Sequence, residues 1–480
     1  MSLASVKCSR LEYPPVSLLR PCWLLACLLL MPCVCAAQST PAQGSAGGAN
    51  VSAAVTLPSG LRVLCRRESG APLVAINIFV RTDDTLARNP ALGSLLARTL
   101  LLSTTNVSTD SLATQISDLG GSVNATWQTD ALQISALVVR DRFRDASFLL
   151  ADVLRNADFD PQGAGVDDAR QQLLSDQDTA SASPFAAGYA AVRKTLYAGS
   201  PYALPALGTE ADAERLTRAD LLRAYSRAFV PSHITVAVVG DIDPSYALRK
   251  ISDDLSDFPP RPGSPSRTGT PPFTTPTPLT ATPAPVRLSL PDLSEVCVIA
   301  GFQTPGSDSA DYPALLVANA LLGGLKTSRL FTALREKMGL GYEVGSGLSV
   351  QAGSGDLIAF ALAAPLHTDP ATKKSAPSIP LLKTQILRQC DALKTTPPTA
   401  AQVQRAQRYL LGSDKIRRER LEDRAALLGL ETLQHGDAAA WEAAWTRRLQ
   451  AVTPADVQRV ASEYFVHPAI VVVAADTKGP

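Results

Sequence analysis

LTRADLLRAYSRAFV, at residues 216–230, returns as VTPADVQRVASEYFV at residues 452–466. Seven of the fifteen positions are identical, among them Thr217/Thr453 and Asp220/Asp456. Each copy starts with a threonine that can cap a helix and runs into a β-branched apolar segment, which predicts a capped helix followed by a buried strand. A repeat at about half the chain length indicates a tandem duplication with two similar domains, not an array of short units.

The first 37 residues differ from the rest of the chain. Lys7, Arg10 and Arg20 precede an uncharged apolar run from Cys22 to Val34, and a short segment suited to cleavage follows. This order is typical of a secretory signal peptide, and the run is shorter than the ~20 apolar residues of a membrane-spanning helix. We therefore expect residues 1–37 to be a signal peptide, the protein to be exported to the periplasm or secreted, and the mature chain to have no integral membrane span.

A proline-rich stretch marks the boundary between the two copies. Ten of the 27 residues from 259 to 285 are proline, which favours a semi-rigid linker over a packed core. We expect a flexible lead-in at residues 38–50, an N-terminal domain at 51–258 and a C-terminal domain at 286–480. The 480 residues, 46% of them hydrophobic, can bury two sizeable cores.

Charge and cysteine content exclude several classes of protein. The chain has 45 basic and 44 acidic residues, so its balanced charge gives no sign of a nucleic-acid partner. Beyond the leader, only Cys65, Cys297 and Cys390 occur. Their odd number and wide spacing predict no disulfide framework.

The order of the predicted elements indicates an α+β fold with two homologous halves, each a mainly antiparallel sheet with helices packed on it. In the first half we expect strands at Leu73–Val80, Ser122–Trp127 and Ala131–Val138, and helices at Asn89–Leu102, Asp110–Leu119, Arg140–Arg155 and Gly165–Leu196.

This order resembles the insulinase/pitrilysin type of zinc peptidase, whose two halves form a clamshell. The residues that carry the resemblance are GGSVNA at 120–125, Tyr197 with Pro201-Tyr202, Val239-Gly240-Asp241, and SRLFTALREKMGLGY at 328–342.

Active members of that family carry an inverted zinc motif, H-x-x-E-H, on the first long helix. Positions i, i+3 and i+4 place two imidazoles and a general-base carboxylate on one helix face. Aligning Thr104 with the threonine that follows the motif places these functions at Ser94, Ala97 and Arg98. Serine is a poor zinc ligand, alanine cannot accept a proton, and a guanidinium repels a dication, so we expect no metal and no catalytic residue here.

The family's third ligand, a glutamate on a later helix, corresponds to Asp176. We expect Arg98 and Asp176 to form an ion pair in the space of the lost metal; the alternative is two solvated surface charges. The histidines His233, His367, His435 and His467 have no second ligand at helical spacing and indicate no other metal site.

Arg335 and Tyr342 match a pair that, in the resembled family, reaches from the C-terminal half and holds the substrate backbone. A forked donor and a hydroxyl suit carbonyl recognition. The alternative is a solvated arginine and a tyrosine that begins a strand.

The resemblance therefore implies a pseudoenzyme, inactive by itself, that forms a heterodimer with a homologous zinc-carrying peptidase subunit. An extended peptide substrate would add to the strand Ser122–Trp127. Alternatives are a peptide-binding or structural protein without a peptidase partner and, last, an autonomous zinc metallopeptidase.

Overall fold

The computed structural model describes residues 52–258, 276–351, 353–369 and 372–476. The expected signal peptide, the expected lead-in and residues 259–275 of the expected linker lie outside the described residues.

The first half is built on a six-stranded sheet with the order β1-β2-β6-β3-β5-β4. All neighbouring strands are antiparallel except the parallel pair β2 and β6. β1 and β2 form a hairpin whose turn contains Gly60 at φ +90°, a conformation that glycine adopts without strain. The strands are β1 Ser52–Thr56, β2 Arg62–Arg67, β3 Leu73–Arg81, β4 Ser122–Trp127, β5 Ala131–Val139 and β6 Ile234–Gly240.

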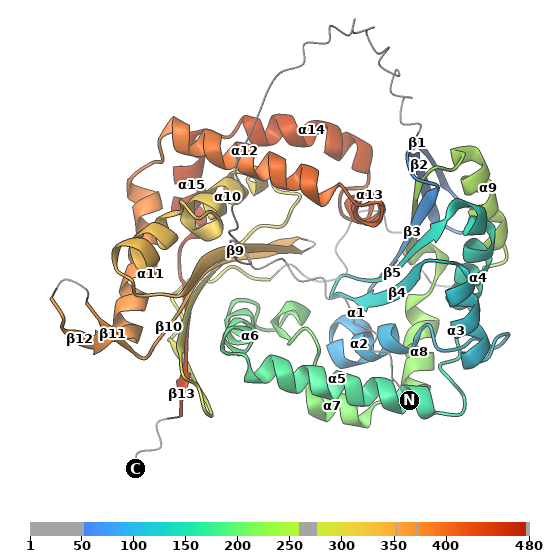
Figure 1. Cartoon of the computed structure of the whole chain (residues 1–480), viewed down its shortest axis with the longest axis horizontal. Helices are drawn as coiled ribbons and strands as arrows, with labels where there is room; N and C mark the ends of the chain where they lie inside the picture. Colours follow the sequence, from blue (N-terminus) through green and yellow to red (C-terminus); the bar gives the residue numbers. More distant parts are fainter. Residues whose placement is uncertain (1–51, 259–275, 352, 370–371, 477–480) are drawn as a thin grey trace, which may run out of the picture. The chain divides into compact units, whose positions relative to one another are not determined.

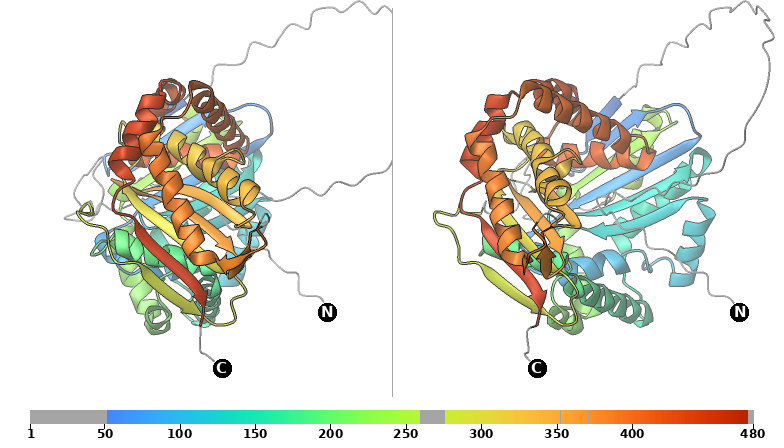
Figure 2. Two further views of the ribbon diagram at one scale, coloured as in Figure 1. Left: turned by 90° about the vertical axis from the view of Figure 1, so that its left-hand side faces the viewer. Right: turned by 60° about the vertical axis from the view of Figure 1, so that its left-hand side comes forward.

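The second half repeats this topology in a five-stranded sheet with the order β7-β13-β8-β10-β9. Here the parallel pair, β7 and β13, lies at the edge because, among the described residues, no strand equivalent to β1 precedes β7, and the remaining pairs are antiparallel. The red strand β13 in Figure 2 therefore lies within the sheet formed by the second half. The strands are β7 Val286–Leu290, β8 Val296–Thr304, β9 Glu343–Gln351, β10 Ser354–Ala363 and β13 Ala469–Ala475.

Both copies of the repeated sequence form the predicted helix and strand. Thr217 caps α8 and Thr453 caps α15, each in a capping box in which the threonine and the aspartate three residues later bond one another's backbone. The strands that follow are β6 and β13, at equivalent places in the two sheets. The α+β class and the two similar halves are thus confirmed.

The helices of the first half agree with the sequence analysis except in one place. The single helix expected at 165–196 is two helices, because Pro184 cannot continue α5 and Ser183 is extended and caps α6. The helices are α1 Asp84–Ala87, α2 Pro90–Thr99, α3 Thr109–Asp118, α4 Phe143–Asn156, α5 Ala164–Ala182, α6 Pro184–Leu196, α7 Glu210–Arg215, α8 Arg218–Ala228 and α9 Pro244–Asp254, with short 3-10 turns at Arg140–Arg142, Pro201–Ala203 and Pro231–His233.

The second half adds a small hairpin, β11 Leu366–Thr368 with β12 Ser375–Pro377, between β10 and α11. Of two π-helical segments, η4 Ala320–Gly324 precedes the SRLF motif and η5 Phe331–Lys337 begins at its phenylalanine. The α-helices are α10 Tyr312–Asn319, α11 Ser378–Thr395, α12 Ala400–Arg417, α13 Leu421–His435, α14 Ala438–Gln450 and α15 Pro454–Tyr464. No helix in these described parts, or in those of the first half, is long and apolar enough to cross a membrane.

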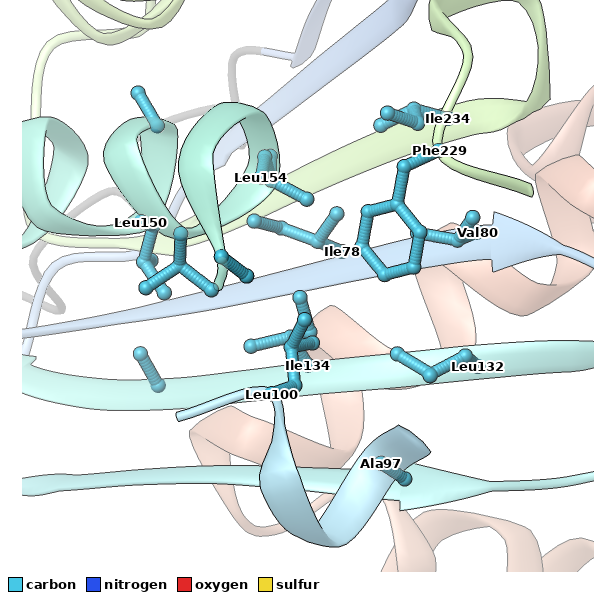
Figure 3. Packing of buried hydrophobic residues seen from close by; sticks show 14 of the residues in the cluster. Ile78, Val80, Ala97, Leu100, Leu132, Ile134, Leu150, Leu154, Phe229 and Ile234 are labelled. Carbon is cyan, nitrogen blue, oxygen red and sulfur yellow. The ribbon is translucent and has the colours of Figure 1, made fainter. Parts of the chain in front are cut away.

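Each half has its own apolar core between the sheet and its helices. In the first half, Ile78 and Ile134 from the sheet pack with Leu150 from α4 and Leu100 at the end of α2 (Figure 3). At about 25 cal/mol per Å2 of buried apolar surface, such side chains provide most of the stabilisation. In the second half, an equivalent cluster joins β8 and β10 to α10, α11 and α15.

The opposite face of each sheet is covered by a helix from the other half. Helix α6 packs on β8 and β13, and helix α13 packs on β3 and β6 (Figure 1). Both helices approach closely at a glycine: a Cβ on Gly188 would lie 3.0 Å from Ile299 Cδ1, and one on Gly429 would lie 2.5 Å from Phe79 Cε2. The two halves therefore exchange equivalent helices, and neither sheet is complete without the other half.

Candidate functional site

The helix aligned with the inverted zinc motif, where we expect no metal, is α2. Asn89 caps this helix by accepting a hydrogen bond from the Leu92 N–H at 3.0 Å, and Pro90 occupies its first turn, where a missing N–H costs nothing. Leu92, Leu95 and Leu96 are buried against the sheet. The sequence therefore forms this helix through a side-chain cap, a proline in the first turn and a buried apolar face.

Two of the three aligned positions on α2 are buried and cannot act on a metal. Ser94 and Ala97 are each 4% exposed, and Ala97 belongs to the core of the first half (Figure 3). The Ser94 hydroxyl finds no hydrogen-bond partner among the described residues. A buried methyl and a single buried hydroxyl supply neither a general base nor an imidazole.

The third position, Arg98, forms the expected ion pair with Asp176 of α5. Arg98 Nη2 lies 2.6 Å from Asp176 Oδ2, and the two side chains are 25% and 31% exposed. Gln172 Nε2 also donates to Asp176 Oδ1 at 3.2 Å. The carboxylate at the third-ligand position therefore has two side-chain donors, one of them cationic, and the alternative of two solvated charges is wrong.

The residues at this place do not fit a zinc ion. A zinc site needs three or more imidazole, thiolate or carboxylate ligands, whereas the three aligned positions on α2 are a serine, an alanine and an arginine, and the arginine binds Asp176. Across the described ranges, no cluster of three or more His, Cys, Asp or Glu side chains could hold a metal. The described cysteines Cys65, Cys297 and Cys390 are free and buried, and burial raises the pKa of each thiol to about 12.

Beside α2 lies β4, an edge strand of the first sheet. In the part of the chain that the structure describes, β4 pairs only with β5, so its outer edge can accept another strand. Trp127, the last residue of β4, packs over Gly93 of α2, where an added Cβ would lie 2.4 Å from the indole Cε2. Because Gly93 has no side chain, the Trp127 indole packs directly on α2 and connects the edge strand to the helix. The sequence analysis missed this contact.

Arg335 and Tyr342 lie together in the second half. The Arg335 guanidinium carbon lies 5.4 Å from the centroid of the Tyr342 ring and 5.2 Å from that of Phe331. Tyr342 is 74% exposed, while its backbone N–H is fixed to Leu362 O at 3.0 Å. Within the described residues, the guanidinium and the Tyr342 hydroxyl have no hydrogen-bond or ion-pair partner, so both groups can contact a ligand.

A buried carboxyl between the halves was also missed. Asp356, on β10, is fully buried and accepts hydrogen bonds from the Tyr189 and Tyr197 hydroxyls of α6, each at 2.8 Å. Its pKa lies above the ordinary value because burial outweighs the opposing effects of Arg193 and the tyrosines. The sequence offered one signal for this site, because Asp356 is the single acidic residue in the apolar strand SGDLIAFALA. This cluster fixes α6, and so the first half, to the second sheet.

Two family models match the chain. "Insulinase (Peptidase family M16)" matches residues 81–210, and "Peptidase M16 inactive domain" matches residues 215–410. The two matches are consecutive and together cover most of the described chain.

Similar proteins agree with these models. An uncharacterized zinc protease of Mycobacterium leprae is 28% identical over 335 residues, which is 67% of this chain and 73% of the relative. A protease from Helicobacter pylori matches 88% of this chain and 100% of its own, with a TM-score of 0.77 and 17% identity. A peptidase M16 inactive domain from Pseudomonas fluorescens matches 90% of this chain and 99% of its own, with a TM-score of 0.76 and 19% identity. The two structural matches show that the clamshell fold of two α+β halves is shared.

Proposed function

Because this chain belongs to the insulinase family of peptidases, family M16, we propose that it is a non-catalytic subunit of an exported zinc metallopeptidase. Its partner is a homologous chain that carries an intact H-x-x-E-H motif and the zinc ion. This chain contributes substrate-binding groups and needs no cofactor of its own.

The observation that carries the proposal is the Arg98–Asp176 ion pair. A chain that had only lost a ligand would keep a carboxylate able to bind a metal weakly. Here the carboxylate is bound to an arginine at 2.6 Å, and the remaining two positions are buried without donor groups suited to zinc. The helix of the catalytic site has thus been kept as part of the core, while its chemistry has been replaced.

The retained groups support a role in holding substrate. Arg335 and Tyr342 are stacked and have polar groups available, which suits recognition of peptide carbonyls. Edge strand β4 can hold an extended peptide by adding a strand to the sheet.

The first test is the metal content of the purified mature chain, measured by mass spectrometry after dialysis against zinc. We expect far less than one zinc ion per chain and no peptide hydrolysis. One tightly bound zinc ion per chain together with chelator-sensitive cleavage would contradict the proposal and favour an autonomous peptidase.

The second test is reconstitution with a homologous chain that carries H-x-x-E-H. Cleavage by the mixture should fall with Arg335→Lys, which keeps the charge but loses the fork, and with Tyr342→Phe, which loses only the hydroxyl. Arg408→Gln, at an exposed arginine on α12, is the control and should leave cleavage unchanged. A stable homodimer that binds peptide but never associates with such a chain would favour the peptide-binding or structural alternative.

A further inference from the structure

Two arginines of the second half, the half-buried Arg329 and the exposed Arg405, line a small surface pocket. It lies between the segment that follows η4 and the first turns of α12. Its polar lining is Thr327, Arg329, Gln402 and Arg405, against apolar walls from Leu321 and Leu325. Every polar side chain in this lining carries a hydrogen-bond donor.

The positive charge of this pocket is not balanced by the protein. Across the described ranges, no carboxylate lies within ion-pair distance of Arg329 or Arg405. Arg329 is half-buried, and the described hydrogen bond of its guanidinium is to the Thr396 carbonyl at 3.0 Å. Burial lowers the pKa of Arg329, because removing a guanidinium from water without a counter-charge disfavours the charged form. Most of its five N–H groups therefore remain available to a bound anion.

The neighbouring groups add donors and no negative charge. Gln402 Oε1 accepts a hydrogen bond from the Thr399 N–H at 2.8 Å in the capping box of α12, which leaves Nε2 as the free end of its amide. The pocket also adjoins the first turn of this 18-residue helix, where the helix dipole favours an anion. A planar or tetrahedral oxyanion is the ligand that such forked donors bind in pairs.

We propose that this pocket binds a small oxyanion, a carboxylate or a phosphate group, between Arg329 and Arg405, with Gln402 and Thr327 as further donors. The site is separate from the degenerate metal site on α2 and does not depend on a peptidase partner. Because Thr327, Gln402 and Arg405 are exposed, the pocket is open to solvent, and a larger ligand could bind there through an anionic end.

Calorimetric titration of the full mature chain with inorganic phosphate, and separately with sodium acetate at matched ionic strength, tests the site. We expect saturable binding of at least one of these probes. Arg405→Gln should weaken binding about tenfold, as expected for the loss of a charged hydrogen bond. Arg329→Lys, which keeps the charge but loses the fork, should also weaken it. Tighter binding of phosphate would identify the natural ligand as one with a phosphoryl group, and tighter binding of acetate would identify it as one with a carboxylate.

Arg408→Gln is the matched control, since Arg408 is an exposed arginine of the same helix outside the pocket. It should bind the anion as the wild type does. Loss of affinity in Arg408→Gln equal to that in Arg405→Gln would show non-specific attraction and overturn the proposal, as would the absence of saturable binding of both anions. Unchanged urea midpoints for the variants would show that they are folded.

Discussion

A double-mutant cycle on Arg98 and Asp176 tests whether the degenerate metal site is held by an ion pair. The four proteins are the wild type, Arg98→Ala, Asp176→Ala and the double variant. An exposed pair couples by about 0.2 to 1 kcal/mol, and hydrogen bonds to charged groups contribute about 1.5 to 3 kcal/mol. Because these side chains are 25% and 31% exposed and 2.6 Å apart, we expect a coupling of about 1 to 1.5 kcal/mol.

The two single variants should differ. Without Arg98, Asp176 keeps its hydrogen bond from Gln172, whereas without Asp176 the half-buried guanidinium keeps no described side-chain acceptor. Asp176→Ala should therefore lower the free energy of unfolding more than Arg98→Ala does.

The assay is urea unfolding followed by tryptophan fluorescence, and the m-values of the four proteins must agree. The control is the same cycle on Arg88 and Asp84, a 2.8 Å pair whose side chains are 56% and 59% exposed, for which we expect about 0.3 to 0.5 kcal/mol. High salt should reduce the control coupling more strongly, because exposed charges are screened more. Equal couplings for the two pairs would refute the assignment of Arg98–Asp176 as the group that replaces the metal.

Three further predictions concern stability and use urea or thermal unfolding. Asp356→Ala should lower the free energy of unfolding by about 2 to 4 kcal/mol, because two buried tyrosine hydroxyls lose their acceptor. Asp356→Asn keeps an acceptor oxygen and should change the free energy by less than about 1 kcal/mol. Equal losses in the two variants would contradict the role of Asp356 as the acceptor. Gly93→Ala should lower the free energy of unfolding by about 1 to 3 kcal/mol and shift the fluorescence emission of Trp127, because the new methyl group overlaps the indole. An unchanged unfolding midpoint would show that this contact does not contribute to stability. Hydrogen bonds from Thr453 lower the pKa of Asp456 in the folded state, so its stabilising contribution is present above the ordinary value near ~4 and is lost as the pH falls through the folded-state value. The stability difference between wild type and Asp456→Asn should therefore be smaller at pH 3 than at pH 7, and a difference that grows on acidification would contradict the assignment.

Features that depend on nearby residues could be predicted from the sequence. The two capping boxes each join residues three positions apart, so the repeat alone specified both helices and the strands after them. The Arg98–Asp176 pair could be predicted because a resemblance to an active site fixes two positions that are 78 residues apart. Without that resemblance, neither charge differs from an ordinary surface residue.

Features that depend on which helix covers which sheet could not be predicted. The apolar pattern of α6 or α13 shows that a face is buried, but it does not say that the face packs on the sheet of the other half. The break between α5 and α6 could be predicted, because the Ser183-Pro184 pair favours an extended residue before the proline. The single helix expected at 165–196 did not take this pair into account. Asp356 could have been recognised as unusual in an apolar strand, whereas its two tyrosine partners, on α6 of the other half, depend on the fold.

The exchange of α6 and α13 has a consequence for how the protein is made. The chain emerges amino-terminus first, in synthesis and in export alike, so all strands of the first sheet are present before α13, at Leu421–His435, and until then the surface around Ala75 and Ala237 is left without its cover. The second sheet has no such delay, since α6 has already emerged when β8 and β13 form. The amino-terminal half must therefore wait until nearly the whole chain has emerged, and during that interval its uncovered strands are exposed to aggregation.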